Sequence, residues 1–317
     1  MKNGLIVAAI LTCIFPAIVL AVTRPFLTPE DNSAVTTADS TQALPDETMH
    51  ISVLTDAGVV DMELEAYICG VVLGEMPADF ELEALKAQAV VARTYTCRKL
   101  DDPKHSNAHL CTDASCCQAF CSADAFLQGG GTEESLQKVR SAVITTAGEV
   151  LRYNGELIEA TYFSCSGGKT EDAKAVWGTD VPYLQSVSSP GEEAATHYTD
   201  TVTFSATQFA EKLGVSDAAL WDQGIGSIAY TRGGGVETIE IGGIVFSGTR
   251  VRQMLGLRST AFVITWAGEN VTLTTKGFGH RVGMSQYGAE AMAVAGEPYE
   301  EILYHYYPGT VLSPAVS

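Results

Sequence analysis

The chain has 317 residues, enough for two modest domains or one large one, and 46 % of them are hydrophobic, which indicates a packed core rather than disorder. Its 38 acidic residues outnumber 19 basic ones, and the net charge is −19. A chain this acidic does not bind by neutralising phosphates, so we expect no nucleic-acid partner.

Residues 4–22 form an uncharged apolar segment that follows Met1, Lys2 and Asn3. At about 1.5 Å per residue, a helix of this length spans roughly 28 Å, close to the thickness of a bilayer core. We favour a single transmembrane anchor over a cleaved signal peptide, for which Val19-Leu20-Ala21 is a weak site. Both interpretations put the rest of the chain outside the cytoplasmic membrane. Residues 23–48, rich in Thr, Ser, Asp and Pro, are predicted to be a flexible linker.

The folded part is predicted to span residues 49–312 and to begin with a hairpin over 50–64. A helix over 63–76 should follow and end at Met76, because a residue before proline avoids the helical region. The next helix, starting near residue 80, has Leu82, Leu85, Ala89 and Ala92 on one stripe. Lys86 and Arg93 share a second stripe, and Gln88 and Tyr95 form a third. We expect this polar side to line a polar cleft.

The remaining pattern mixes helices and strands, which predicts an α+β fold. Asn154-Gly155 is a strong hairpin signal, and the strand after it ends in a glycine-containing loop over 164–168. A glycine-rich loop enters a helix of small residues at 277–296. The other predicted units are a helix over 133–148, a strand and a capped helix over 201–214, strands and a helix over 236–257, a hairpin over 261–277 and a helix over 299–309.

Four of the eight cysteines lie between Cys111 and Cys121, close to His105 and His109. A disulfide framework would be spread along the chain, so the clustering favours metal binding. Thiolate and imidazole are the ligands that zinc prefers. A disulfide between Cys111 and Cys117 is the alternative.

Four motifs, GVVLGEMP, EALKAQAVVARTY, GFGHRVGMSQYGA and YEEILYHYYPGT, occur in one order along the chain. Together they resemble the stage II sporulation protein D family of lytic transglycosylases, whose wider group includes amidase enhancers. The resemblance covers residues 49–312. It implies two lobes flanking a substrate groove, and cleavage of peptidoglycan between N-acetylmuramic acid (MurNAc) and N-acetylglucosamine (GlcNAc). The setting it implies is remodelling of the septal wall during engulfment of the developing spore.

The resemblance places the catalytic glutamate at Glu75 and a structural zinc on His105, Cys111 and Cys117, with the fourth ligand left open among water, His109, Cys116 and Cys121. One glutamate can act first as the acid and then as the base if its carboxyl is protonated near neutral pH, which requires partial burial. Substrate-binding roles are expected for Lys86, Gln88, Arg93, Tyr95, Ser164, Thr170, His280, Ser285, Gln286 and Tyr287, while Tyr162, Ser166 and Trp177 are further candidates for the cleft wall.

Two other functions remain open. The domain could be a non-catalytic enhancer that presents glycan to an amidase, or Cys165 and His280 could form a hydrolytic thiol–imidazole pair. The resemblance implies peptidoglycan strands as the substrate. It implies an amidase-endopeptidase and other membrane proteins of the engulfment machinery as partners. His197 and His305 are interpreted as packing residues.

Overall fold

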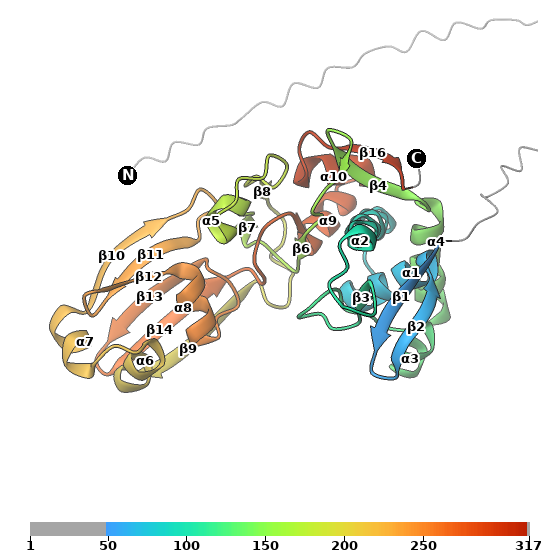
Figure 1. Cartoon of the computed structure of the whole chain (residues 1–317). Coiled ribbons are helices and arrows are strands. Elements are labelled where there is room, and N and C mark those ends of the chain that lie inside the picture. Colours follow the sequence, from blue (N-terminus) through green and yellow to red (C-terminus); the bar gives the residue numbers. More distant parts are fainter. Residues whose placement is uncertain (1–48, 316–317) are drawn as a thin grey trace, which may run out of the picture. The chain divides into compact units, whose positions relative to one another are not determined.

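The computed structural model describes residues 49–315 (Figure 1). The predicted anchor at 4–22 and the predicted linker at 23–48 lie outside this range. Across residues 49–315, no helix has both the length and the apolar character that crossing a membrane requires.

The first hydrophobic core is built on two consecutive helices, α1 (Leu64–Glu75) and α2 (Leu82–Asp101). The predicted hairpin precedes them as strands β1 (His50–Thr55) and β2 (Gly58–Glu63), which pair antiparallel. Helix α1 ends at the predicted place, because Met76 is extended in front of Pro77. This end fixes the position of Glu75, the last residue of α1.

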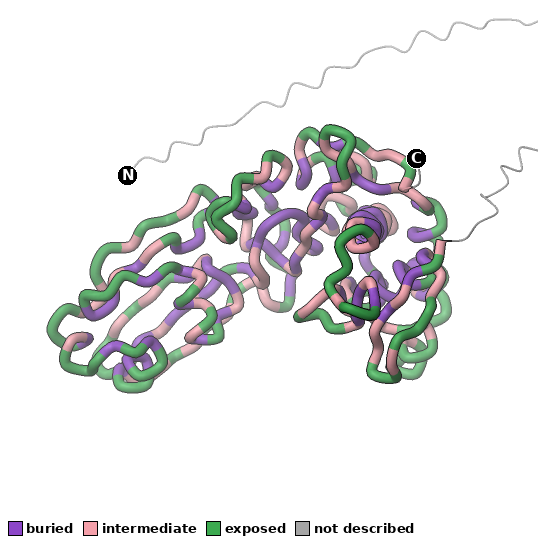
Figure 2. The backbone as a smooth tube through the Cα atoms, viewed as in Figure 1, coloured by how far each residue is buried: buried purple, intermediate pink, exposed green. Residues whose placement is uncertain are grey.

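Helix α2 is buried on nearly all sides rather than on one stripe, as Figure 2 shows along its axis. Its alanines and valines let neighbouring elements approach closely. Those neighbours are α1, α4 (Glu133–Thr145), β4 (Glu149–Tyr153), α9 (Gln286–Val294) and α10 (Tyr299–Tyr306).

Strand β4 lies in the middle of a three-stranded sheet. It forms the predicted hairpin with β5 (Glu156–Leu157), and both turn residues have positive φ, 51° at Asn154 and 86° at Gly155. On its other edge β4 pairs with β16 (Val311–Pro314), close to the end of the described chain.

Several short strands and helices lie between the elements described so far, and some of the loops that join them surround Glu75. Strand β3 lies parallel to β1, β6 lies parallel to β15, and β7 pairs antiparallel with β8. These elements and two short helices are β3 (Leu110–Cys111), α3 (Ala123–Gln128), β6 (Tyr162–Phe163), β7 (Gly168–Lys169), α5 (Ala173–Trp177), β8 (Ser188–Ser189) and β15 (Met284–Ser285).

A second hydrophobic core lies between residues 199 and 276. Two antiparallel sheets, ordered β10-β11-β12 and β13-β14-β9, pack with helices α6 and α8. Its elements are β9 (Thr199–Ser205), α6 (Ala206–Leu213), α7 (Asp217–Gln223), β10 (Ile225–Tyr230), β11 (Val236–Ile241), β12 (Ile244–Ser247), α8 (Gly248–Leu255), β13 (Phe262–Ala267) and β14 (Asn270–Lys276).

The α+β prediction is confirmed, since helices alternate with several small sheets. Helices α3, α5 and α7 and strand β10 are among the elements that the sequence does not predict. The exposed positions of β10 do not alternate regularly with buried ones, because the strand carries irregularities at Ile225–Ile228 and Ala229–Tyr230. Without alternation a strand has no period-2 signal in its sequence.

Candidate functional site

Glu75 is half-buried at the C-terminal end of α1. Met76 is already extended and leaves the helix axis, so the Glu75 carboxyl lies at the end of the helix. Its Oε1 atom accepts a hydrogen bond of 2.6 Å from the backbone N–H of Ala119. Its Oε2 atom lies 3.5 Å from Nε2 of Gln286 at the start of α9. The carboxyl is therefore held from two segments that are far apart in sequence.

Burial raises the pKa of Glu75 above its ordinary value, because a charged carboxylate loses solvation in this setting. The nearby Ala119 N–H, Tyr162 hydroxyl and Gln286 amide act in the opposite direction. The raised pKa enlarges the protonated fraction near neutral pH. A carboxyl in this state can donate a proton, and its hydrogen-bond donors can then stabilise the carboxylate that remains.

Two hollows meet at Glu75 and share Ser164. The larger has a volume of about 350 Å³ and is lined by Glu75, Tyr95, Ala114, Cys117, Gln118, residues 160–164, Phe278, Gly279 and His280. The smaller, of about 260 Å³, is lined by Glu75, Pro77, Ser164, Thr196, His197, Gln286 and Tyr287. Glu75 is the one carboxylic acid among the described residues that line them.

A buried amide supports the floor of the larger hollow. Nε2 of Gln118 donates to Oγ1 of Thr96 at 3.1 Å, and Oε1 of Gln118 accepts from the Tyr162 hydroxyl at 3.1 Å. Gln118 is 1 % exposed, so both bonds are shielded from water. They fix the segment whose next residue, Ala119, donates to Glu75.

Five of the predicted substrate-binding residues line the hollows: Tyr95, Ser164, His280, Gln286 and Tyr287. Ser285 lies beside them, but it is fully buried. Its hydroxyl caps helix α9 by accepting from the N–H of Gly288 at 3.2 Å.

Like Ser285, the four remaining predicted residues line neither hollow. Lys86 pairs with Glu83 at 2.6 Å, one turn away on α2. Thr170 is buried and accepts from the backbone N–H of Val187 at 2.8 Å. The other two are Gln88 and Arg93.

Gln88 and Arg93 are both 0 % exposed, so this side of α2 lies in the core instead of facing a cleft. Arg93 is neutralised by Glu65 of α1 through two hydrogen bonds, of 2.9 and 2.6 Å. That partner lies 28 residues earlier, outside any helical spacing. From its charge, Arg93 is expected to be exposed. The ion pair with Glu65 from another helix allows it to be buried instead.

The thiol–imidazole pair finds no support. Cys165 is 0 % exposed, and burial raises the pKa of its thiol to about 11. Burial lowers the pKa of His280 to about 4, so its imidazole is neutral. Nδ1 of His280 accepts from the N–H of Val282, and the ring packs near Phe163 and Trp177.

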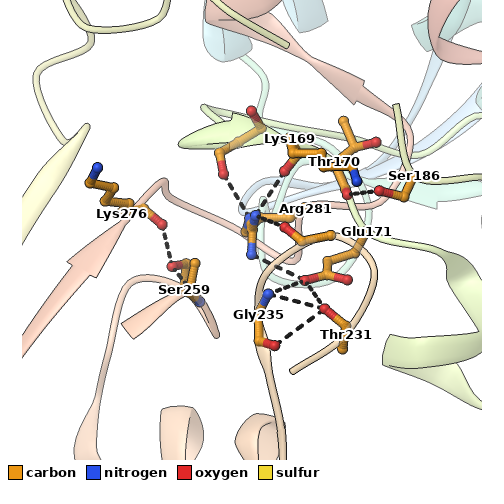
Figure 3. Close-up of polar contacts among 12 residues, drawn as sticks. Lys169, Thr170, Glu171, Ser186, Thr231, Gly235, Ser259, Lys276 and Arg281 are labelled. Atoms are coloured by element: carbon orange, nitrogen blue, oxygen red, sulfur yellow. Dashed lines mark hydrogen bonds and ion pairs between the residues drawn. The ribbon is translucent and has the colours of Figure 1, made fainter. Parts of the chain in front are cut away.

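Directly after His280, Arg281 forms a buried polar cluster that reaches the second core (Figure 3). Arg281 donates to Glu171 at 3.1 Å and to the carbonyl oxygen of Gly233, which lies between β10 and β11, at 2.8 Å. Glu171 also accepts from Thr231 and from the N–H of Gly235. Arg281 has a positive φ of 67°, which the cluster holds in place.

The histidine–cysteine segment gathers four candidate metal ligands. Sγ of Cys116 and Sγ of Cys117 lie 3.7 and 3.6 Å from Nε2 of His105, and 3.9 Å from each other. With Cys111 they form a group whose ligand atoms all lie within 4.8 Å of one another. Tetrahedral zinc, with bonds of about 2.3 Å to sulfur and about 2.0 Å to nitrogen, needs edges of about 3.5–3.8 Å.

These residues could hold a tetrahedral metal ion, and of the ligands that the sequence left open, Cys116 lies in the group. His109 belongs to another interaction, because its Nδ1 accepts from the backbone N–H of Ser52. Cys121 is not in the group. The alternative disulfide is not formed, since Cys111 and Cys117 are both free thiols.

The site contains residues that the sequence did not identify. Ala119 contributes only its backbone N–H, for which a sequence holds no signal. Phe278 belongs to a recognised motif but had been given no role. Thr196 and His197 come from a loop without periodicity or motif, and His197 was interpreted as packing.

Comparison with known proteins identifies the family to which these motifs belong. A family model described as stage II sporulation protein matches residues 56–153. The chain is 42 % identical over 267 residues to stage II sporulation protein D of Bacillus subtilis (strain 168), covering 81 % of this chain and 76 % of that protein. The protein of the same name from Bacillus amyloliquefaciens is 42 % identical over 265 residues.

A third relative, the amidase enhancer of Bacillus subtilis (strain 168), is 31 % identical over 300 residues. That match covers 77 % of this chain and 40 % of the enhancer. The four sequence motifs, the family model and the extent of the first match all point to the same family. The chain belongs to the stage II sporulation protein D family.

Proposed function

We propose that this protein is a peptidoglycan lytic transglycosylase that cleaves the bond between MurNAc and GlcNAc and leaves 1,6-anhydro-MurNAc ends. One observation carries the proposal: a single carboxylic acid with a raised pKa lies where two hollows meet. Ordinary glycoside hydrolases need two carboxylates. A transglycosylase needs one, because the nucleophile is a hydroxyl group of the sugar itself.

In the first step, Glu75 gives its proton to the oxygen that bridges the two sugars, and the bond from that oxygen to the anomeric carbon of MurNAc breaks. The Ala119 N–H and Gln286 then stabilise the carboxylate. In the second step, this carboxylate takes the proton of the 6-hydroxyl of the same MurNAc. The hydroxyl oxygen bonds to the anomeric carbon, and no water is consumed.

The test is replacement of Glu75 by glutamine, which keeps the shape and removes the proton donor. We expect Glu75→Gln to lower the release of anhydro products from purified cell-wall sacculi by about 10²–10⁴-fold, the usual contribution of general acid–base catalysis. Mass spectrometry of the released sugars measures it. Glu81→Gln, at an exposed position before α2, is the control and should act like the wild type. Normal release by Glu75→Gln would refute the mechanism.

The amidase enhancer among the relatives supports a second candidate, a non-catalytic domain that presents glycan to an amidase. The same experiment separates the two. An enhancer would bind glycan strands without releasing anhydro sugars on its own, and Glu75→Gln would not change the stimulation of an added amidase.

We also propose a structural zinc held by His105, Cys111, Cys116 and Cys117. When bound, the ion would cross-link the segment that leads into Gln118 and Ala119, and so steady the N–H that faces Glu75. With four protein ligands it has no open position for catalysis.

The zinc proposal is tested by metal analysis of the purified protein. Cys116→Ser should lower zinc retention against a chelator, and it should weaken the sulfur-to-metal absorption of the cobalt-substituted protein. Cys121→Ser, a cysteine outside the group, should leave both unchanged. Equal retention by the two variants would exclude Cys116 as a ligand.

The family supports a role in sporulation. We propose further that a single-pass membrane anchor at residues 4–22 holds the domain at the septal wall. An amidase-endopeptidase and other membrane proteins of engulfment are the proposed partners. The link to an amidase agrees with the name of the enhancer relative.

A further inference from the structure

We propose that Thr196 and His197 form a second sugar-binding subsite, which holds the N-acetylhexosamine ring on one side of the bond that Glu75 cleaves. The proposal rests on the proposed function, since it assumes that the ligand is a glycan. Neither residue belongs to one of the family motifs found in the sequence.

The starting point is the pair of hollows that meet at Glu75. A glycosidic oxygen that takes the proton of Glu75 joins two sugars, so one ring must lie on each side of the carboxyl. The hollows measure about 350 and 260 Å³, just above and just below the lower limit of the roughly 300–1,000 Å³ typical of ligand pockets. Each therefore suits about one ring, and the smaller hollow takes the second sugar.

The loop that carries Thr196 and His197 is fixed at both ends. At its start, Glu192 is 1 % exposed, and its Oε2 accepts from the N–H groups of Ser166 at 2.7 Å and Gly167 at 2.9 Å. At its end, the carbonyl oxygen of Tyr198 accepts from the N–H of Gly277 at 2.8 Å. A buried carboxylate with these partners holds the loop against the segment that follows Ser164.

Between these anchors the ring of His197 is oriented by an edge-to-face contact with Phe278, at 5.4 Å between centroids. Phe278 itself lines the larger hollow, so the two rings connect the subsites. Within residues 49–315, no hydrogen bond is made by the imidazole of His197 or the hydroxyl of Thr196. Both groups line the smaller hollow and are available to a ligand.

The chemistry of the hollow matches an N-acetylated sugar. An imidazole and a hydroxyl can each donate and accept hydrogen bonds, as sugar hydroxyls and an acetamido group require. Tyr287 offers an aromatic ring for contact with a pyranose, and Phe80 holds that ring edge-on at 5.0 Å. Protonation of the glycosidic oxygen stays with Glu75, so His197 is assigned to binding.

The first measurement separates binding from chemistry by using Glu75→Gln protein. Its affinity for purified, peptide-free glycan strands is compared with that of the double variant Glu75→Gln/His197→Ala. We expect the double variant to bind about tenfold more weakly, the effect of one to two lost hydrogen bonds. Glu75→Gln/His50→Ala is the matched control, because His50 lies on strand β1 and pairs with exposed Asp61. Equal affinity of the two double variants would overturn the proposal.

The second measurement uses the chain with Glu75 intact. His197→Ala should raise KM about tenfold with kcat little changed, and His197→Gln, which keeps a donor and an acceptor, should restore much of the loss. If His197→Ala fails to fold, Thr196→Val gives the same test at an exposed position. A fall in kcat with unchanged KM in the folded variants would contradict a binding role. Weaker binding with no anhydro product from wild type would refute the proposed reaction and leave the subsite standing.

Discussion

At the scale of single residues, the chemistry of Glu75 reflects a balance of opposing effects on one carboxyl. Burial raises its pKa, while the nearby Ala119 N–H, Tyr162 hydroxyl and Gln286 amide lower it. In the proposed reaction, burial alone would favour the protonated carboxyl and hinder the later step, in which the group must accept a proton. The donors moderate the shift, so that the same side chain can serve in both proposed steps.

This balance predicts the effect of Tyr162→Phe. The Tyr162 hydroxyl lies within reach of both Gln118 and the Glu75 carboxyl, and its removal takes away one influence that lowers the pKa of Glu75. The pKa of Glu75 should then rise further. Because the first step needs the protonated form, the alkaline limb of the profile of kcat/KM against pH should move to higher pH. Kinetics of sugar release across a pH series check this.

Tyr153→Phe is the matched control, because Tyr153 packs against Tyr183 away from Glu75. Its alkaline limb should coincide with that of the wild type. A limb that stays in place or moves to lower pH in Tyr162→Phe would show that this hydroxyl does not stabilise the carboxylate.

At the scale of elements, the site depends on how closely α1 packs against residues 118–121. Gly70 and Gly74, one turn apart on α1, face this segment, and the N–H of Cys121 donates to the carbonyl oxygen of Gly70 at 2.9 Å. A Cβ at Gly74 would lie 2.8 Å from the backbone nitrogen of Phe120. The absence of a side chain there lets the Ala119 N–H reach Glu75.

Gly74→Ala is therefore expected to reduce activity although alanine is the better helix former, by about 1 kcal/mol. The added methyl should displace the backbone at residues 119–120 and lengthen the hydrogen bond to Glu75. Steady-state kinetics should show kcat falling by at least about tenfold, the equivalent of one lost hydrogen bond to a charged group. Circular dichroism should show the helical content retained. A variant with normal kcat would indicate that residues 119–120 can shift without loss of the hydrogen bond to Glu75.

Much of this element structure could be predicted from the sequence. Helices α1 and α4 and the hairpin β4–β5 follow from a proline stop, apolar periodicity and Asn154-Gly155. The face of α2 could not be predicted, because burial of Arg93 depends on Glu65 from another helix. The same limit applies to the site: motifs identify Glu75 and Gln286, whereas Ala119 and His197 arrive through tertiary packing.

At the scale of the whole described chain, the second core connects through Arg281 to the glycine-rich loop that precedes α9. The sequence predicted a groove flanked by two lobes. The two hollows at Glu75 are lined by residues outside 199–276, so the second core lines neither of them. Its Gly233 carbonyl oxygen accepts from Arg281, and its Thr231 and Gly235 donate to Glu171, the buried partner of Arg281. Figure 3 shows this cluster around Glu171 and Arg281.

Breaking this pair should destabilise the protein strongly. Glu171→Ala leaves the guanidinium of Arg281 buried without its carboxylate, and such losses cost about 3–5 kcal/mol. Urea unfolding measures the free energy. Arg98→Ala, which removes a half-exposed pair with Glu159, should cost about 1 kcal/mol or less. Similar losses in the two variants would mean that the buried pair is not a major support.

The placement of Glu75 as the last residue of α1 has one more consequence. Peptide dipoles along a helix add up to a partial negative charge at its C-terminal end, and that charge opposes ionisation of a nearby carboxyl. Had the chain run through this helix in the reverse direction, the same side chain would have met a partial positive charge and lost its proton more readily. The polarity of one helix thus favours a cycle that opens with proton donation.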